Sequence, residues 1–169
     1  MLRQEGENGL SLADFVAGKD GVAGIFAVNA GTGIAERAAQ LRQEQNDDYS
    51  ALLLQTLASH LADAAAEYVQ TVFWKWDKAR TIRPAIGYPV CPDHTLKQDV
   101  LSLLDAAQIG ITLTENMMMT PAASVCGFLL TASEACYFPV GNITEQTLSD
   151  YAALRRTSAE QLRKFVAGL

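Results

Sequence analysis

Residues 83–94 read "RPAIGYPVCPDH" and lie between two segments with helical periodicity. Pro84, Pro89 and Pro92 fix three φ angles and remove three N–H donors, while Gly87 permits close approach of the backbone. A segment this rigid is ordered before any ligand arrives. Two interpretations follow: a stiff connection that covers a sheet, or a preformed binding loop.

As a binding loop, the segment offers a guanidinium at one end and an aromatic ring in its middle. Arg83 would hold a carboxylate through its planar fork. Backbone groups from Ala85 to Gly87 would hold a flat base, with Tyr88 beside them. The residues alone favour the two interpretations equally.

Composition and charge exclude several classes of protein. The chain has 169 residues, of which 49% are hydrophobic and 19% charged, which suits one globular domain with a real core. The net charge of −6 argues against a general nucleic-acid surface. No apolar run approaches the ~18 residues that a membrane span requires, and the acidic, polar start lacks the features of a signal peptide. We expect residues 1–10 to form a flexible N-terminus and residues 11–169 a single module.

The three cysteines, Cys91, Cys126 and Cys136, are an odd number without paired spacing. This pattern predicts reduced thiols and a cytoplasmic protein.

The order of elements predicts an α+β fold, in which a small antiparallel sheet packs against a long helix and shorter helices. A buried strand is expected over residues 24–31, followed by a helix. A long helix is expected over residues 47–73, with Asn46 or Asp47 as its cap. Another helix is expected from Thr95, with Gln98 completing a capping box and Gly110 ending it.

Apolar residues recur at gaps of three and four along residues 47–73, which predicts one continuous buried stripe. The stripe comprises Tyr49, Leu52, Leu53, Leu57, Leu61, Ala64, Ala65, Tyr68, Val69 and Val72. His60 lies at its edge with no cysteine or second histidine four residues away. We therefore predict a core-edge histidine with one hydrogen-bond partner rather than a metal ligand.

Three strand-like runs follow, "ITLTENMMM" (111–119), "SVCGFLLTA" (124–132) and "CYFPVGNI" (136–143). The segments between them are short enough to join antiparallel neighbours. Two short helices are expected to close the chain, the second with a capping box formed by Ser158 and Gln161.

Two other motifs favour structural roles. "NAGTGIAE" (29–36) lies between a strand and a helix, but Glu36 replaces the third glycine of a dinucleotide loop and would repel a pyrophosphate. Cys91 and His94 are separated by Pro92, which disfavours a nucleophile pair. We expect Asp93 or His94 to order the start of the next helix, and no metal site.

The run "RPAIGYPVCPDHTLK" closely resembles the "RPAxGYPxCPxHxxK" signature of the activation domain of cobalamin-dependent methionine synthase. Five further segments resemble the family in the same order. "LADFVA", "FAVNAG" and "NDDYSALLLQTLASHLADAAAEY" lie upstream of the signature, and "LTENMMMTPAASVCGF" and "YFPVGNI" lie downstream. The resemblance extends from about Leu10 to Ile143.

This resemblance implies an S-adenosylmethionine-binding module for the reductive reactivation of cobalamin. It implies a partner domain or protein that carries cobalamin and a flavodoxin-type electron donor, with no nucleic acid and no membrane. The sequence contains neither the cobalamin-binding "DxHxxG" loop nor homocysteine and folate modules. Alone, this chain is therefore not expected to be a complete enzyme.

Carried over by position, the family's contacts fall on Arg83 for the carboxylate and on the backbone of Ala85 and Gly87, next to Tyr88. The aromatic pair falls on Tyr137 and Phe138, with Tyr137 near the sulfonium in a cation–π arrangement. The family's domain is about twice as long, and its N-terminal portion carries an acidic residue that meets the donor's amino group. A second chain or protomer that completes the site is therefore expected. The alternative is a non-catalytic interaction module that docks on a cobalamin-binding protein and has a degenerate site.

Overall fold

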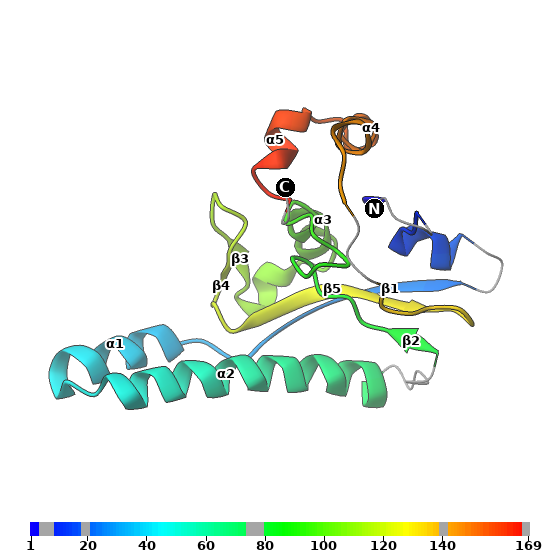
Figure 1. Cartoon of the computed structure of the whole chain (residues 1–169). Helices are drawn as coiled ribbons and strands as arrows, with labels where there is room; N and C mark the ends of the chain where they lie inside the picture. Colours follow the sequence, from blue (N-terminus) through cyan, green and yellow to red (C-terminus); the bar gives the residue numbers. More distant parts are fainter. Residues whose placement is uncertain (4–8, 18–20, 74–79, 139–141, 167–169) are drawn as a thin grey trace.

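The central feature is a three-stranded antiparallel sheet with the order β1-β5-β2 (Figure 1). The structure is a computed structural model that describes residues 1–3, 9–17, 21–73, 80–138 and 142–166. The strands are β1 (Val22–Asn29), β5 (Ser124–Thr131) and β2 (Thr81–Ile82), and a separate hairpin pairs β3 (Thr112–Leu113) with β4 (Met119–Thr120). The predicted α+β class is confirmed.

Helices cover both faces of this sheet. They are η1 (Leu12–Val16), α1 (Ile34–Gln45), α2 (Asp48–Tyr68) with its π-helical extension η2 (Val69–Phe73), α3 (Leu96–Leu103), η3 (Ala106–Ile109), α4 (Glu145–Arg155) and α5 (Ala159–Arg163). Figure 1 shows α2 along one face, with α3, α4, α5 and both termini on the other side. Within the described residues, no helix combines the length and the apolar character needed to cross a membrane.

The signature segment is itself part of the sheet edge. Ala85 lies opposite Gly127 in the same register that β2 keeps with β5. Phe128 N–H donates to the Pro84 carbonyl and Ile86 N–H donates to the Cys126 carbonyl, both at 3.0 Å. Because Pro84 has no N–H, one bond of the ladder is missing there. The rigid segment therefore extends β2 along β5.

The core lies mainly on the face of the sheet opposite α2. There, side chains from the signature and β5 pack against α3 and η1; they include Leu12, Ile82, Ile86, Val100, Leu101, Cys126 and Leu130. The other face is thinner, where Phe26 and Leu129 pack against Ala66 of α2.

The buried face of α2 differs from the prediction. Its buried residues are Ala51, Ala58, Ala62 and Ala66. The large residues of the predicted stripe are exposed, Leu57 at 58% and Leu61 at 60%. The expectation of a buried stripe is therefore wrong. Small side chains let the helix axis approach the sheet and α1 closely, so size and not hydrophobicity selects the buried face.

His60 is exposed on α2, so the prediction of a core-edge position is wrong as well. The predicted cap at the start of this helix is confirmed, because the Asp47 carboxylate accepts the Ser50 N–H at 2.9 Å.

The start of α3 is ordered by Asp93 rather than by a capping box at Thr95. The Thr95 side chain makes no capping hydrogen bond. Instead, Asp93 Oδ1 accepts the Thr95 N–H at 2.8 Å and the Thr95 hydroxyl at 2.6 Å. The ordering role of Asp93 is confirmed. The helix ends at Leu103, and Gly110 caps η3 with a left-handed φ of 76°. At α5, the Ser158 side chain accepts the Gln161 N–H, which is one half of the predicted capping box. The Gln161 side chain instead accepts the Thr157 hydroxyl at 2.7 Å.

The three predicted strands differ in outcome. The run 111–119 is not one strand but contains β3 and the first residue of β4. The run 111–119 folds back on itself, because the Met117 N–H donates to the Thr114 carbonyl and the Thr114 N–H to the Met118 carbonyl. Its polar centre forms a tight turn with φ of 56° at Met117. Residues 136–138 are not in a strand, and the part of the third run at 139–141 lies outside the described residues. The run 124–132 forms the strand β5 (Ser124–Thr131) as predicted, and its neighbours are β1 and β2.

Candidate functional site

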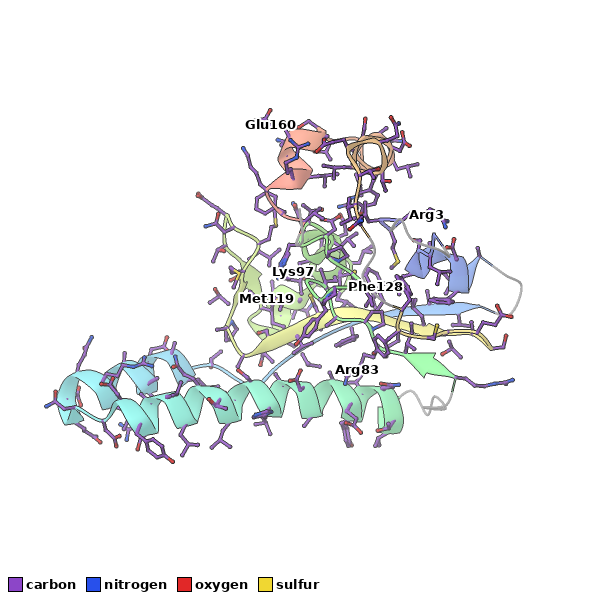
Figure 2. All side chains as sticks on the ribbon, in the orientation of Figure 1. Arg3, Arg83, Lys97, Met119, Phe128 and Glu160 are labelled. Carbon is purple, nitrogen blue, oxygen red and sulfur yellow. The ribbon has the colours of Figure 1, made fainter. Side chains whose placement is uncertain are left out.

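The Arg83 guanidinium lies on the α2 face at the open edge of the sheet (Figure 2). Its Nε donates to Gln70 Oε1 at 3.2 Å, and its central carbon lies 5.8 Å from the centre of the Phe26 ring. Among the described residues no carboxylate forms an ion pair with it. Its two terminal nitrogens therefore remain for a ligand, and Gln70 and Phe26 hold the planar group in one orientation.

Gln70 is a site residue that the sequence analysis missed. It lies in η2, is only 7% exposed, and donates from Nε2 to the Thr81 carbonyl at 3.4 Å. That donation leaves Oε1 to accept the Arg83 Nε–H. Gln70 follows Ala58, Ala62 and Ala66 at steps of four, so a polar residue on a small-residue face was the signal in the sequence. π-Helical turns such as η2 are frequent at functional sites.

Tyr137 lies against the same edge as Arg83. The Arg83 N–H donates to the Tyr137 hydroxyl at 3.0 Å, and the tyrosine is 60% exposed. The hydroxyl of an exposed aromatic ring therefore meets the open strand edge at the Arg83 backbone.

The backbone of Ala85 points outward from the sheet. The ladder bonds on either side of it, at Pro84 and Ile86, make Ala85 and Gly127 a non-hydrogen-bonded pair. The Ala85 N–H finds no acceptor within the described residues, and its carbonyl is 3.4 Å from the Tyr88 nitrogen. This edge offers one donor and one weakly occupied acceptor to a planar ligand.

The chain then turns at Gly87, whose φ of 98° suits the third position of a type II turn. A Cβ at Gly87 would lie 2.7 Å from His94 Cε1, so the ring occupies the space that a side chain would need. The turn is closed by two bonds of 2.8 Å, from the Gly87 N–H to the Cys91 carbonyl and from the Cys91 N–H to the Tyr88 carbonyl. Tyr88 is 59% exposed at its tip.

The His94 ring packs against Gly87 of this turn, and Lys97 contacts His94. The Lys97 Nζ lies 2.8 Å from His94 Nδ1 and 3.0 Å from the Met117 carbonyl, although Lys97 is only 5% exposed. Burial lowers the pKa of Lys97. Burial, and then the neighbouring Lys97 charge, lower the pKa of His94. A neutral imidazole accepts from Lys97 at Nδ1 and carries its proton on Nε2. The pair joins the signature to the β3–β4 hairpin.

We expect the free energy of unfolding to fall as the pH drops below about 6.5, the usual pKa of histidine. The pKa of His94 is lowered in the folded state, so in that range the unfolded chain binds more protons and stability is lost. The groups around the ring are Lys97, Asp93 and the Gly87 turn. Urea unfolding between pH 7.5 and 5 should show the loss in the wild type and in His60→Gln. His94→Gln, which keeps an acceptor, should flatten it; an unchanged slope would contradict the role of His94.

Asp93 ties the signature to the C-terminal helices. Its side chain is fully buried, and Oδ2 accepts the Tyr151 hydroxyl of α4 at 2.6 Å. Burial, together with the hydrogen bond to Asp93, raises the pKa of Tyr151 well above its usual value. The His94 N–H also donates to the Phe165 carbonyl at 2.9 Å. The end of the signature is therefore held on two sides.

Tyr151→Phe is expected to lower the free energy of unfolding by about 2 kcal/mol, because a buried carboxylate loses a charge-assisted hydrogen bond. Urea unfolding at pH 7 measures the effect. Tyr49→Phe is the matched control, since Tyr49 is 76% exposed and should change stability by less than about 0.5 kcal/mol. Equal midpoints for the two variants would exclude a stabilising role for the Asp93–Tyr151 bond.

The structure brings most of the predicted residues to one edge. Arg83, Ala85, Gly87 and Tyr137 lie along it, with Tyr88 at the tip of the turn. Phe138 is 9% exposed and its ring centre lies 6.1 Å from that of Phe15, within the main core. The described residues hold no group of three histidine, cysteine or acidic side chains that could bind a metal ion.

Two comparisons with known proteins identify what this chain is similar to. The family described as "Vitamin B12 dependent methionine synthase, activation domain" matches residues 1–156. A crystal structure of the MetH reactivation domain bound to AdoHcy is similar in fold, with a TM-score of 0.83 and 32% sequence identity over 97% of this chain. The chain spans 58% of the length of that structure. It belongs to the family of activation domains of vitamin B12-dependent methionine synthases.

Proposed function

We propose that this chain binds S-adenosylmethionine at the Arg83 edge and serves the reductive remethylation of cobalamin in methionine synthase or a related corrinoid methyltransferase. The observation that carries the proposal is the Arg83 guanidinium, oriented by Gln70 and Phe26 yet without a carboxylate partner among the described residues. The similar MetH reactivation domain was solved with AdoHcy, the demethylated form of this ligand.

Each residue of the edge has a distinct role in the proposal. Arg83 binds the carboxylate of the methionine moiety through two parallel hydrogen bonds. The outward N–H and C=O of Ala85, with the backbone of Gly87, bind the adenine, and Tyr88 flanks the turn. The exposed Tyr137 ring faces the sulfonium, where a cation–π contact favours the positively charged donor over its neutral product. Phe138 anchors the segment that carries Tyr137.

The contribution of the protein is positioning rather than chemistry. Cobalamin on a partner domain or chain would supply the methyl acceptor once a flavodoxin-type donor had reduced it by one electron, and the acceptor's electron pair would form the new bond to the methyl group. When the methyl group leaves, the sulfur keeps the electron pair of the broken bond and becomes the thioether of S-adenosylhomocysteine. Arg83 and the Ala85 edge hold both ends of the donor, so that its methyl group faces outward to the partner. The three unpaired cysteines fit a cytoplasmic setting for this partnership.

Isothermal titration calorimetry with S-adenosylmethionine and S-adenosylhomocysteine tests the proposal. The wild type should bind both ligands. Tyr137→Leu should weaken S-adenosylmethionine more than S-adenosylhomocysteine, because only the former carries the sulfonium charge. Tyr137→Phe, which keeps the ring and loses the hydrogen bond to the Arg83 N–H, should preserve this preference. Absence of binding by the wild type, even with the cobalamin-carrying partner present, would refute the proposal.

A second candidate is a non-catalytic interaction module that docks on a cobalamin-binding protein. The observation that favours it is that the chain spans only 58% of the length of the similar reactivation domain. Capture of a cobalamin-loaded methionine synthase fragment, with and without S-adenosylmethionine, separates the two candidates. Capture that the ligand leaves unchanged supports the interaction module, whereas capture that the ligand strengthens supports the first candidate.

A further inference from the structure

Within the described residues, β1 leaves one edge of the sheet unpaired, on the side away from β2 (Figure 1). The Ala30 N–H donates to the Ala123 carbonyl at 3.0 Å, which fixes the alternation of hydrogen-bonded pairs between β1 and β5. The backbone N–H and C=O groups of Ala23, Ile25 and Ala27 therefore point away from β5. No turn, loop or helix of the described residues forms a backbone hydrogen bond with them.

This edge lacks the features that usually protect a free strand. Natural proteins shorten such strands or place bulges, prolines or charged side chains on them. β1 has eight residues, "VAGIFAVN", without a proline or a charge. It pairs with β5 in one unbroken register from Val22 to Asn29. An edge of this kind binds an extended peptide as an added strand.

Two apolar hollows lie along the free edge. One, of about 310 Å³, is lined by residues 25–27 of β1, by Val69 of η2 and by residues 104–106, 108 and 109. The other, of about 600 Å³, is lined by residues 23–25 of β1, by η1 and by Phe128 and Leu130 of β5. Ile25 and Leu104 line both hollows, and Leu104 is 39% exposed. A strand that pairs with β1 can therefore place apolar side chains in both.

We propose that an extended segment of a partner chain, apolar along its length and with a basic residue near one end, pairs antiparallel with β1 and adds a strand to the sheet. The ladder runs along Ala23, Ile25 and Ala27, and the apolar side chains of the segment fill the two hollows. It ends at Asn29, whose side chain donates to the Ile109 carbonyl at 2.7 Å. The antiparallel direction follows the rest of the sheet, in which both strand pairs are antiparallel.

A separate segment suits the hollows better than β1 of a second copy does. The side chains of β1 are already engaged within their own chain. Phe26 packs on the α2 side of the sheet, and Ile25 and Ala27 pack on the main core. β1 of a second copy therefore has no apolar side chains left to fill the hollows. A single strand, about 4.8 Å from β1, needs only the space beside the edge, whereas a second copy brings helices on both faces of its own sheet.

The basic residue of the segment is expected beside Asp105. Among the described residues that line the hollows, only Asp105 has a charged side chain, and it forms no ion pair with another described residue. It is exposed and accepts a hydrogen bond from the Gln108 side chain at 2.5 Å. The net charge of −6 also favours a basic partner over an acidic one.

Amide NMR of the isotope-labelled full chain, titrated with the terminally blocked peptide Lys-Val-Thr-Val-Thr-Val, tests the pairing. The amides of Ala23, Ile25 and Ala27 should shift and become protected from hydrogen exchange, and those at the Arg83 edge should not change. N-methylation of one alternate set of peptide amides should weaken binding by about tenfold, because it removes the donors that face β1. N-methylation of the other set should have little effect.

Replacement of the lysine in the peptide by glutamine tests the charge match. The change should weaken binding to the wild type by about threefold, as expected for an exposed ion pair, and Asp105→Asn should abolish this difference. Asparagine also tolerates the left-handed φ of 49° at this position. Asp63→Asn is the matched control, because Asp63 is exposed on α2 and lines neither hollow. It should keep the difference, and an equal loss in the two variants would contradict the role of Asp105.

Ala23→Pro tests the edge from the side of the protein. The Ala23 N–H points outward, so proline removes a donor to the peptide and leaves the ladder with β5 intact. Binding should weaken by about tenfold, and circular dichroism checks that the variant is folded. Three results would overturn the proposal: amide shifts at the Arg83 edge or at neither edge, binding that N-methylation and Ala23→Pro leave unchanged, or a wild type that dimerises in sedimentation velocity with its β1 amides protected. None of these results depends on the binding of S-adenosylmethionine.

Discussion

Arg83→Ala is expected to weaken the binding of S-adenosylmethionine by more than tenfold and to leave the fold intact. The guanidinium lies at the sheet edge with its Nε held by Gln70 and its terminal nitrogens without an acceptor in the described part of the chain. Its removal therefore costs the ligand two charge-assisted hydrogen bonds and costs the protein only one contact with Gln70 and the packing on Phe26. Calorimetry measures the loss in affinity.

Two further variants separate the contribution of the planar Arg83 guanidinium to ligand binding from the contribution of its positive charge. Arg80→Ala removes an equal charge from an exposed residue just before β2 and should leave affinity within about twofold. Arg83→Lys keeps the charge but loses the planar fork, so it should resemble Arg83→Ala more than the wild type. If Arg83→Ala bound as tightly as Arg80→Ala, the carboxylate of the ligand would have to bind elsewhere.

The elements that the sequence predicted well are those in which one local pattern leaves a single solution. Residues 124–131 form a strand because they are apolar, β-prone and bounded by turn residues. Asp47 caps α2 as expected. The proline-rich segment was recognised as rigid, and its rigidity places Arg83 and Ala85 at an edge where the missing N–H of Pro84 is tolerated.

Three of the differences share a cause, since each depended on a contact between distant segments. The alanine face of α2 is buried because β1 and β5 approach it closely, which hydrophobic periodicity alone does not reveal. Gln70 reaches Arg83 only because η2 ends beneath β2. Phe138 turns into the core because Phe15 of η1 lies there. In each case a partner far away in sequence decides between two faces that the local pattern leaves equivalent.

Gly127→Ala is expected to lower the free energy of unfolding by about 3 kcal/mol, a steric penalty with added loss of hydrogen bonds. A Cβ at this position would lie 2.4 Å from the Pro84 carbonyl oxygen and 2.9 Å from Ala85 Cα. Both atoms are backbone atoms of a strand held on β5 by the Ile86 and Phe128 ladder bonds, so neither can move without breaking them. Urea unfolding measures the loss, and hydrogen exchange at those two amides should accelerate most.

Gly33→Ala is the matched control for this prediction. Gly33 has a positive φ of 83°, and a Cβ there would meet nothing within 4 Å. The control therefore carries only the backbone cost of about 1 kcal/mol, and the excess at Gly127 measures the steric clash. If the two variants were equally stable, the signature would not be held on β5 as tightly as the ladder bonds indicate.

Gly127→Ala also separates an effect on stability from an effect on ligand binding. Displacement of the Pro84–Ala85 backbone moves the Arg83 fork away from Gln70 and turns the outward N–H of Ala85, so Gly127→Ala should weaken S-adenosylmethionine binding even where the chain remains folded. Tyr151→Phe breaks a bond at the far end of the signature and should lower stability without that loss of affinity. A common loss of affinity in both variants would mean that binding follows global stability. Loss in Gly127→Ala alone would mean that the register of the signature on β5 positions the site.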